Sequence, residues 1–202
     1  MTPTLDEFIH EAVQKVGLRF YFDTTVILDL LRPKRRPQSR ELLQIAQSQG
    51  WTCVSSYYAR MEALAVEQEH TWLRGQLRRG EYLERLIFRS RRELEIRRGR
   101  ELTRQALTRI SNQFHKKLVT EIEQFIEWVA LDQDGWEEAT TLASRTNISA
   151  PDSIHVATAL RTNCHILVTS DEALRELAAD AIRLEDPKVL LASLKKILGA
   201  NP

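Results

Sequence analysis

The segment 19–31, Arg-Phe-Tyr-Phe-Asp-Thr-Thr-Val-Ile-Leu-Asp-Leu-Leu, joins an apolar run, an aspartate and a second apolar run with helical character. The aromatic run at 19–22 predicts a buried strand that ends before Asp23. Residues 24–31 predict a short helix that Pro33 terminates. A buried strand followed at once by a helix is the unit from which parallel sheets are built.

The same strand signal recurs four more times along the chain, at 51–54, 126–131, 165–168 and 182–184. Helical patterns lie between these strands, at 5–16, 39–48, from 55 or 56 onward, and at 136–144, 151–161, 171–178 and 187–198. Alternation of strands and helices implies crossover connections and a mostly parallel sheet. We therefore predict an α/β fold of three α/β/α layers.

One region interrupts this alternation, because residues 67–124 contain no strand signal. Apolar residues there follow helical spacing in two stripes, with Gly99 expected between them: Leu83, Leu86, Ile87 and Leu94, then Leu102, Leu107, Ile110, Phe114, Leu118, Ile122 and Phe125. We predict a helical extension at 1–18 and a domain at 19–198 that carries a long helical insertion at about 67–124.

The composition fits one globular domain with an appendage. The chain has 202 residues, of which 43% are hydrophobic and 28% charged. No apolar run approaches the about 20 residues of a membrane helix, and the acidic N-terminus lacks the features of a secretory signal. The two cysteines, Cys53 and Cys164, are expected to be buried thiols. We expect a cytoplasmic protein with no membrane partner.

Charge is distributed unevenly. Residues 73–117 hold 14 Lys and Arg against 5 Asp and Glu, a net charge of +9, whereas the whole chain carries +1. A basic segment of this kind suits RNA phosphates, because arginine donates bidentate hydrogen bonds to them. Two other readings stay open: a solvated helix with ion pairs such as Glu81–Arg85 and Glu93–Arg97, or a docking surface for an acidic partner segment.

Four acidic residues follow predicted strands or open predicted helices: Asp23, Glu62, Asp152 and Asp171. In parallel sheets the carboxyl ends of the strands share one edge, where ligands bind. Each acid also has a structural explanation. Asp23 could cap the helix that follows it, Asp152 could pair with Ser149 in a capping box, and Asp171 could lie in the first turn after an N-cap at Ser170. Glu62 could lie on a solvated helix face. As a set they would repel one another unless a hard cation such as Mg²⁺ or Mn²⁺ neutralised them.

Four segments resemble, in order, the four motifs of PIN domains: Phe20-Tyr-Phe-Asp23-Thr-Thr-Val-Ile-Leu, Val54-Ser-Ser-Tyr-Tyr-Ala-Arg-Met-Glu62, Pro151-Asp152-Ser-Ile-His-Val-Ala-Thr-Ala and Ile166-Leu-Val-Thr-Ser-Asp171. The closing Arg183-Leu-Glu-Asp-Pro resembles the usual last strand. The N-terminal helix, the long insertion and Ala63 after Glu62 depart from the compact members of that family.

The resemblance implies a Mg²⁺- or Mn²⁺-dependent nuclease. Small PIN domains are mostly VapC-type toxins of bacterial type II toxin–antitoxin modules, which cut RNA and usually dimerise. By resemblance, Asp23, Glu62, Asp152 and Asp171 form the catalytic, metal-binding quartet, and Thr25 lies near the metal. We also expect Thr25, within the first motif, and Arg60, within the second, to contact substrate.

The prediction is thus a metal-dependent endoribonuclease with an antitoxin partner and a homodimeric assembly. The alternatives are a non-catalytic RNA- or protein-binding module on the same fold, and a DNA-directed nuclease. His155 lies one helical turn after Asp152. It is expected to pack in the core or lie on the surface, and the alternative is that it orients the site. The four tryptophans are expected to pack rather than stack on bases, and Asp29 is expected to be exposed.

Overall fold

The computed structural model describes residues 3–15, 17–32, 34, 36–78, 96 and 98–199. Its centre is a five-stranded sheet in the order β3-β2-β1-β4-β5, and every neighbouring pair is parallel. The strands are β1 Arg19–Phe22, β2 Thr52–Ser56, β3 Glu127–Val129, β4 Ile166–Val168 and β5 Leu184–Glu185. The order places β1 and β4, which precede Asp23 and Asp171, side by side.

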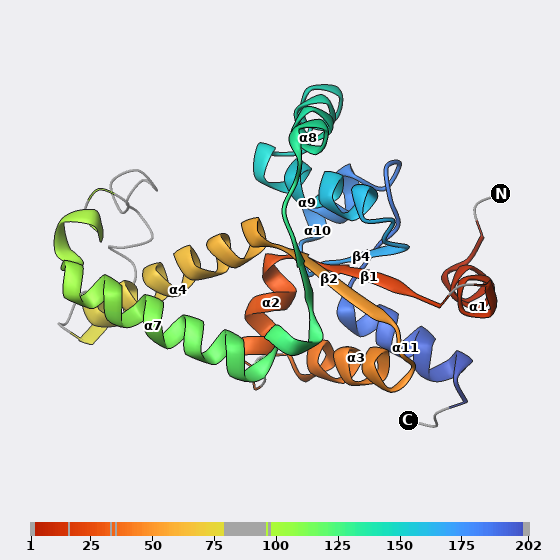
Figure 1. Cartoon of the computed structure of the whole chain (residues 1–202), viewed down its shortest axis with the longest axis horizontal. Helices are drawn as coiled ribbons and strands as arrows, with labels where there is room; N and C mark the ends of the chain where they lie inside the picture. Colours follow the sequence, from red (N-terminus) through yellow and green to blue (C-terminus); the bar gives the residue numbers. More distant parts are fainter. Residues whose placement is uncertain are drawn as a thin grey trace.

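Helices cover both faces of this sheet, which confirms the predicted three-layer α/β/α class (Figure 1). One layer contains α2 Thr24–Leu31, α3 Pro37–Ser48 and α11 Pro187–Ile197, with α1 Leu5–Lys15 packed on α11. The other contains α8 Gln133–Arg145, α9 Ala150–Arg161 and α10 Glu172–Leu177. A 3₁₀ turn, η1 Glu123–Phe125, leads into β3.

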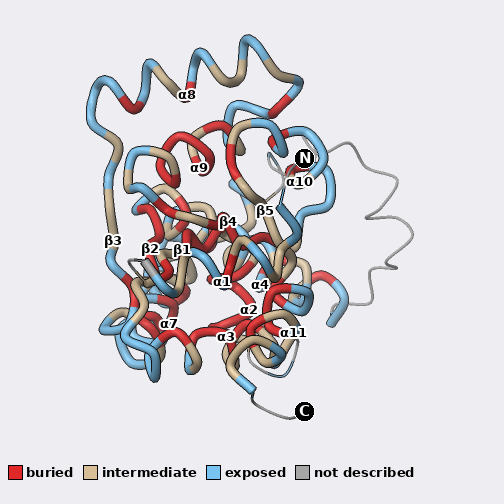
Figure 2. Tube along the Cα trace, turned by 90° about the vertical axis from the view of Figure 1, so that its right-hand side faces the viewer, coloured by how far each residue is buried: buried red, intermediate tan, exposed pale blue. Residues whose placement is uncertain are grey.

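Side chains of the central strands alternate between two hydrophobic cores. Figure 2 shows that buried residues lie along these strands and along the helices that pack on them. Phe20 and Phe22 of β1 face the core shared with α2, α3 and α11, whereas Tyr21 faces the core shared with α9. This alternation follows from the two-residue repeat of a strand. Both cysteines are buried free thiols, as predicted.

Two helices extend together from the edge where β1 and β2 end (Figure 1). They are α4 Tyr57–Arg78 and α7 Arg104–Glu121, and they pack against each other. Ile110, Phe114 and Leu118 form the buried stripe of α7, as predicted. Gly99 does not separate two helices, since residues 98–101 are helical and α7 begins after its N-cap Thr103. The stripe predicted at 83–94 and the ion pairs predicted at 81–97 lie outside the described residues.

The prediction that Asp29 is exposed is wrong, because only 3% of its surface is accessible. Helix α2 is enclosed by α3, α4 and α7, so that all its faces after the first turn are buried. The Asp29 carboxylate lies 4.0 Å from Nε of Arg36. Among the described residues, no helix has the length and apolar character needed to cross a bilayer.

Candidate active site

Asp23 lies where β1 ends and α2 begins, and it is buried with 3% exposure. Its Oδ1 accepts hydrogen bonds from the Val26 backbone N–H at 3.0 Å and the Thr25 hydroxyl at 2.7 Å. Its Oδ2 accepts a hydrogen bond from the Thr169 hydroxyl at 2.6 Å. Asp23 is therefore the N-cap of α2 and is also tied to the segment after β4.

The electrostatics of Asp23 are set mainly by its burial. Desolvation raises the pKa of this carboxyl, while the positive potential of His155 and the hydrogen bonds from Thr169 and Thr25 act in the opposite direction. Loss of hydration disfavours the charged form of an acid. A nearby cation would stabilise the ionised form of this buried carboxylate.

Glu62 projects from the second turn of α4 towards the start of α2. Its Oε2 accepts a 2.5 Å hydrogen bond from the Thr24 hydroxyl and lies 2.7 Å from Nε2 of His155. Burial by itself would raise the pKa of this carboxyl, but hydrogen bonds from His155, Thr24 and Tyr58 outweigh it and lower the pKa. Glu62 is therefore ionised at neutral pH. Thr24, which follows Asp23 in the chain and donates to Glu62, connects the two acids.

His155 joins α9 to both β1 and α4. Its Nδ1 lies 2.8 Å from the hydroxyl of Tyr21, which also bonds to Oγ of Ser56 at 2.9 Å. The residue is 3% exposed. His155 is therefore a buried residue, and it also contacts a predicted site acid, Glu62.

Asp152 opens α9 one turn before His155. Ser149 caps this helix: its hydroxyl accepts from the Asp152 N–H at 3.2 Å and donates to Asp152 Oδ2 at 2.6 Å. The negative charges of Glu62 and Asp152 add to burial in raising the pKa of Tyr58 to about 12. Tyr58 therefore lies within electrostatic reach of both acids.

Asp171 caps α10 and is exposed. Its Oδ1 accepts from the Leu174 N–H at 3.1 Å, and its own N–H donates to the Thr169 hydroxyl at 2.9 Å. Since that hydroxyl in turn donates to Asp23, a chain of two hydrogen bonds connects Asp171 with Asp23. The structural explanations of Asp23, as the cap of α2, and of Asp152, as the partner of Ser149, are thus confirmed. The expected cap at Ser170 is wrong, because Asp171 itself is the N-cap of α10. These roles leave carboxylate lone pairs available for other ligands.

The two predicted substrate contacts lie in different places. Thr25 is inside the acidic network, because its hydroxyl donates to Asp23 and accepts from the Ser170 N–H at 3.0 Å. Arg60 bonds instead to His115 Nδ1 at 2.7 Å and to Glu123 at 3.3 Å, with its guanidinium 5.9 Å from the Trp128 ring centre. The role of each residue towards substrate stays a prediction.

The chemistry of these donors suits a hard divalent cation. All four acids offer oxygen, and within the described part of the chain none forms an ion pair with arginine or lysine. Across those same residues, no three His, Cys, Asp or Glu side chains converge on one point in a metal-holding arrangement. Mg²⁺ is normally held by one or two carboxylates and several waters, so Asp23 and one neighbouring acid fit that requirement.

The residues of this network that were not predicted include Tyr21, Thr24 and Thr169. Thr24 and Thr169 donate to the two most buried site acids, and Tyr21 holds His155. The sequence carried one signal for them, since each adjoins a predicted strand or a predicted site acid. Their hydrogen-bond partners lie on other segments of the chain, so these contacts could be predicted only with the order of strands in the sheet.

Two toxin–antitoxin structures are among the solved structures similar to this chain. One is VapBC2 from Rickettsia felis bound to a promoter DNA fragment, with 11% identity, a TM-score of 0.53, and coverage of 84% of this chain and 98% of that chain. The other is a toxin–antitoxin complex from Klebsiella pneumoniae, with 16% identity, a TM-score of 0.47 and coverage of 83% and 96%. At 11% identity the likeness to VapBC2 concerns the fold alone.

No curated protein matches the sequence. The model of the PIN domain family does match, and it spans residues 20–180, which is most of the chain. The match contains every strand except β5 and includes all four predicted site acids. The resemblance drawn from the four sequence motifs is therefore confirmed, and the chain belongs to the PIN domain family.

Proposed function

We propose that this chain is a divalent-metal-dependent endoribonuclease and the toxin of a type II toxin–antitoxin pair. The observation that carries the proposal is Asp23: a buried carboxylate at the carboxyl edge of a parallel sheet, without an arginine or lysine partner among the described residues. Asp23 and Asp152 are the principal metal ligands in this proposal. Glu62 and Asp171 complete the site directly or through water.

The residues of the chain have separate tasks in this reaction. Bound Mg²⁺ or Mn²⁺ activates water and stabilises charge on the phosphoryl oxygens. Thr25 and Thr169 hold the Asp23 carboxylate in one orientation. Glu62, ionised and fixed by Thr24, supplies further negative charge beside it. Asp152 at the start of α9 and Asp171 at the start of α10 repel the negatively charged substrate unless a cation occupies the site.

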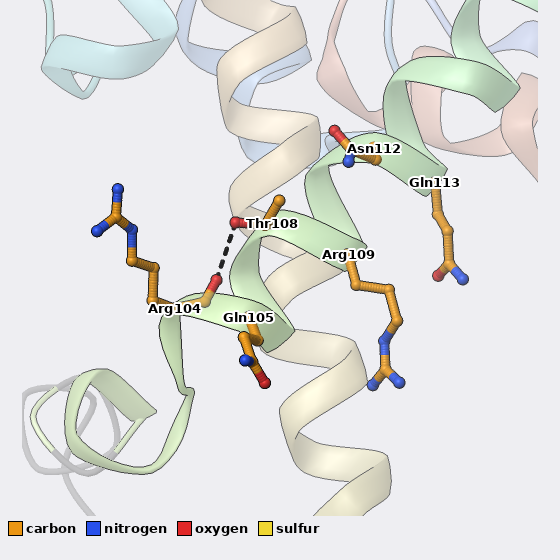
Figure 3. Close-up of a pocket in the computed structure, with 6 residues that line it drawn as sticks. All are labelled: Arg104, Gln105, Thr108, Arg109, Asn112 and Gln113. Atoms are coloured by element: carbon orange, nitrogen blue, oxygen red, sulfur yellow. Dashed lines mark hydrogen bonds between the residues drawn. The ribbon is translucent and has the colours of Figure 1, made fainter.

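The outer face of α7 supports RNA as the substrate. Between 104 and 120 this helix contains no acidic residue, and its exposed side chains include Arg104, Arg109, Lys116 and Lys117. Arg104 and Arg109 point away from the helix, beside Gln105, Asn112 and Gln113 (Figure 3). A positive face on the arm that leaves the sheet beside the site would bind phosphates and increase the local concentration of a polyanion.

The test is a cleavage assay with Mn²⁺ on labelled single-stranded RNA, with single-stranded DNA as competitor. Wild type should cut RNA, and Asp23→Asn and Asp152→Asn should not. Equal cleavage by all three proteins would refute the site. Binding that is unchanged by chelator, with no cleavage under any condition, would support the non-catalytic binding module, which the α7 face alone would explain.

Two protein partners belong to the proposal. An antitoxin is inferred from the fold shared with VapBC2, and co-expression with the product of a neighbouring reading frame tests it. A homodimer is supported by Tyr57, Met61 and Trp136, which are 51%, 63% and 48% exposed. These three side chains are among those that line a cavity of about 290 Å³ between α4, α8 and α9. We call Tyr57, Met61 and Trp136 together the aromatic surface.

A further inference from the structure

Glu62 is held differently from the three aspartates of the proposed site. Asp23 and Asp171 cap helices, so backbone N–H groups orient their carboxylates. The Asp152 carboxylate accepts from the hydroxyl of Ser149, the N-cap of its own helix. Glu62 has a longer side chain within a helix, and its side chain is 28% exposed. A glutamate in that position loses considerable rotamer freedom when fixed, and here the fixing groups are side chains.

The main fixing group is His155, which is itself held on its other side. Nε2 faces Oε2 of Glu62 at 2.7 Å, while Nδ1 bonds to the Tyr21 hydroxyl at 2.8 Å. The imidazole also lies near the rings of Tyr21 and Tyr58, with centroids 5.8 and 5.6 Å away. Four elements, β1, β2, α9 and α4, thus contribute to one line of contacts from Ser56 to Glu62.

An apolar side chain of similar volume could fill the same core position without the cost of burying an imidazole. That cost is offset here because both ring nitrogens have partners. The second partner is a carboxylate of the proposed site, whereas Tyr21 is fully buried and cannot reach solvent or RNA. The line of contacts therefore ends at the site and has no other exposed end.

We propose that Tyr21 and His155 are positioning residues that fix the Glu62 carboxylate for the metal. The inference rests on the proposed nuclease function. Both His155 and Thr24 contact Oε2, so the rotation of the carboxylate is set before a cation arrives. Such outer partners of metal ligands affect metal affinity or activity by about 10–100-fold when removed.

The test compares His155→Ala, His155→Gln and the control Thr158→Val in the full chain. Thr158 lies on the same helix, is 1% exposed, and its hydroxyl donates to the Ile154 carbonyl rather than to the site. Calorimetric titration with Mn²⁺ and steady-state cleavage of RNA are measured for each protein. Thermal melting reports how much of each protein is folded.

We expect His155→Ala to weaken Mn²⁺ binding and to lower kcat by about 10–100-fold, with KM for RNA unchanged. His155→Gln places an amide donor near the position of Nε2 and should recover most of both losses. Thr158→Val should match wild type. Tyr21→Phe removes one hydrogen bond to the imidazole and should cost about 3–10-fold in Mn²⁺ affinity.

A folded His155→Ala protein that binds Mn²⁺ and cuts RNA like wild type would overturn the inference. If that variant does not fold, His155→Gln and Tyr21→Phe decide: loss in Tyr21→Phe with retention in His155→Gln supports it, and no change in Tyr21→Phe overturns it. A wild type that binds Mn²⁺ in a His155-dependent manner but cuts no RNA would refute the nuclease proposal alone. A wild type that binds no Mn²⁺ would refute both.

Discussion

Asp23 caps α2 and carries a carboxylate inside the protein at the same time. Replacing it with asparagine keeps an oxygen for the Val26 N–H and removes the charge that a cation requires. Because loss of an outer partner already costs about 10–100-fold, loss of the ligand should lower cleavage by at least about 100-fold. Initial rates with Mn²⁺ measure this effect.

The matched control is Asp132→Asn. Asp132 caps α8 in the same way, accepting from the Gly135 N–H at 2.9 Å, but it pairs with Arg161 at 2.7 Å away from the site. This variant should retain the cleavage rate of wild type. A similar loss in both variants would mean that capping rather than the site explains Asp23.

The pH dependence of stability gives a second prediction for Asp23. Burial raises its pKa above the ordinary value of 3.8, so its contribution to folding is largest when protonated and is lost as the pH rises through the folded pKa. Without metal, the Tm of Asp23→Asn should exceed that of wild type by a margin that grows as the pH rises above about 4 and levels off above the folded pKa.

At neutral pH a difference of about 2–4 °C would correspond to ~1 kcal/mol for a chain of this size. Thermal melting with chelator at several pH values measures it. Added Mn²⁺ should stabilise wild type but not the variant, since a ligand that binds only the folded state raises its stability. A margin that does not change with pH would contradict the assigned direction of the pKa shift.

At the scale of single residues, the sequence predicted positions better than partners. Asp23 and Asp171 were predicted at strand ends because the strand signal is local. The link between them through Thr169 depends on β1 pairing with β4, which are far apart in the chain. Asp29 was misjudged for the same reason, since its burial comes from three helices packed around α2.

Helix α7 is the element whose proposed role in RNA binding depends most on surface charge. Reversing two of its exposed charges, Arg104→Glu with Arg109→Glu, should raise KM for RNA and leave kcat unchanged, because neither residue contacts the acidic site. If each arginine neutralises one phosphate, the slope of log affinity against log salt should become shallower by about 1.4. Titration of non-cleavable RNA at several salt concentrations measures the slope.

Arg145→Glu, made with the exposed arginine in the last turn of α8, is the control for a general loss of positive charge. Its slope of log RNA affinity against log salt should match that of wild type, because this arginine is not expected to contact RNA. An equal change in slope for the two helices would show that α7 has no special role. It would favour the solvated-helix reading of the basic segment.

At the scale of elements, most boundaries agreed with prediction within one to three residues. The strand β1 and helix α2 were predicted with their observed bounds, because a capping aspartate separates them. Helix α8 begins at Gln133 rather than at 136, since Asp132 caps it four residues before the apolar pattern starts. Gly99 was misread as a helix end, although the cap that begins α7 is Thr103.

At the scale of the whole molecule, the sequence predicted the class of fold but not its surfaces. Alternating strands and helices permit few parallel topologies, and the PIN motifs narrowed them to one. Which side chains remain exposed depends on how the layers pack. Trp51, Trp72 and Trp128 pack at least partly, as expected, whereas Trp136 is 48% exposed and joins Tyr57 and Met61 in the aromatic surface.

That surface leads to a prediction about assembly. Contiguous exposed apolar side chains on a soluble domain mark interaction sites, and a second copy of the chain is the partner proposed here. The double variant Met61→Glu with Trp136→Glu places charge on both α4 and α8, so a dimer that uses this surface should dissociate. Light scattering after size exclusion should give twice the chain mass for wild type and the single mass for the variant.

The control for this assembly is Val189→Glu, because Val189 is 50% exposed on α11, in the opposite helical layer. It should leave the dimer intact. Monomers should retain the Mn²⁺ affinity of wild type. Glu62 also lies on α4, so loss of the dimer could affect the site only through the first turns of this helix. A wild type that is monomeric at all concentrations, or a variant that stays dimeric, would show that the aromatic surface does not join two copies.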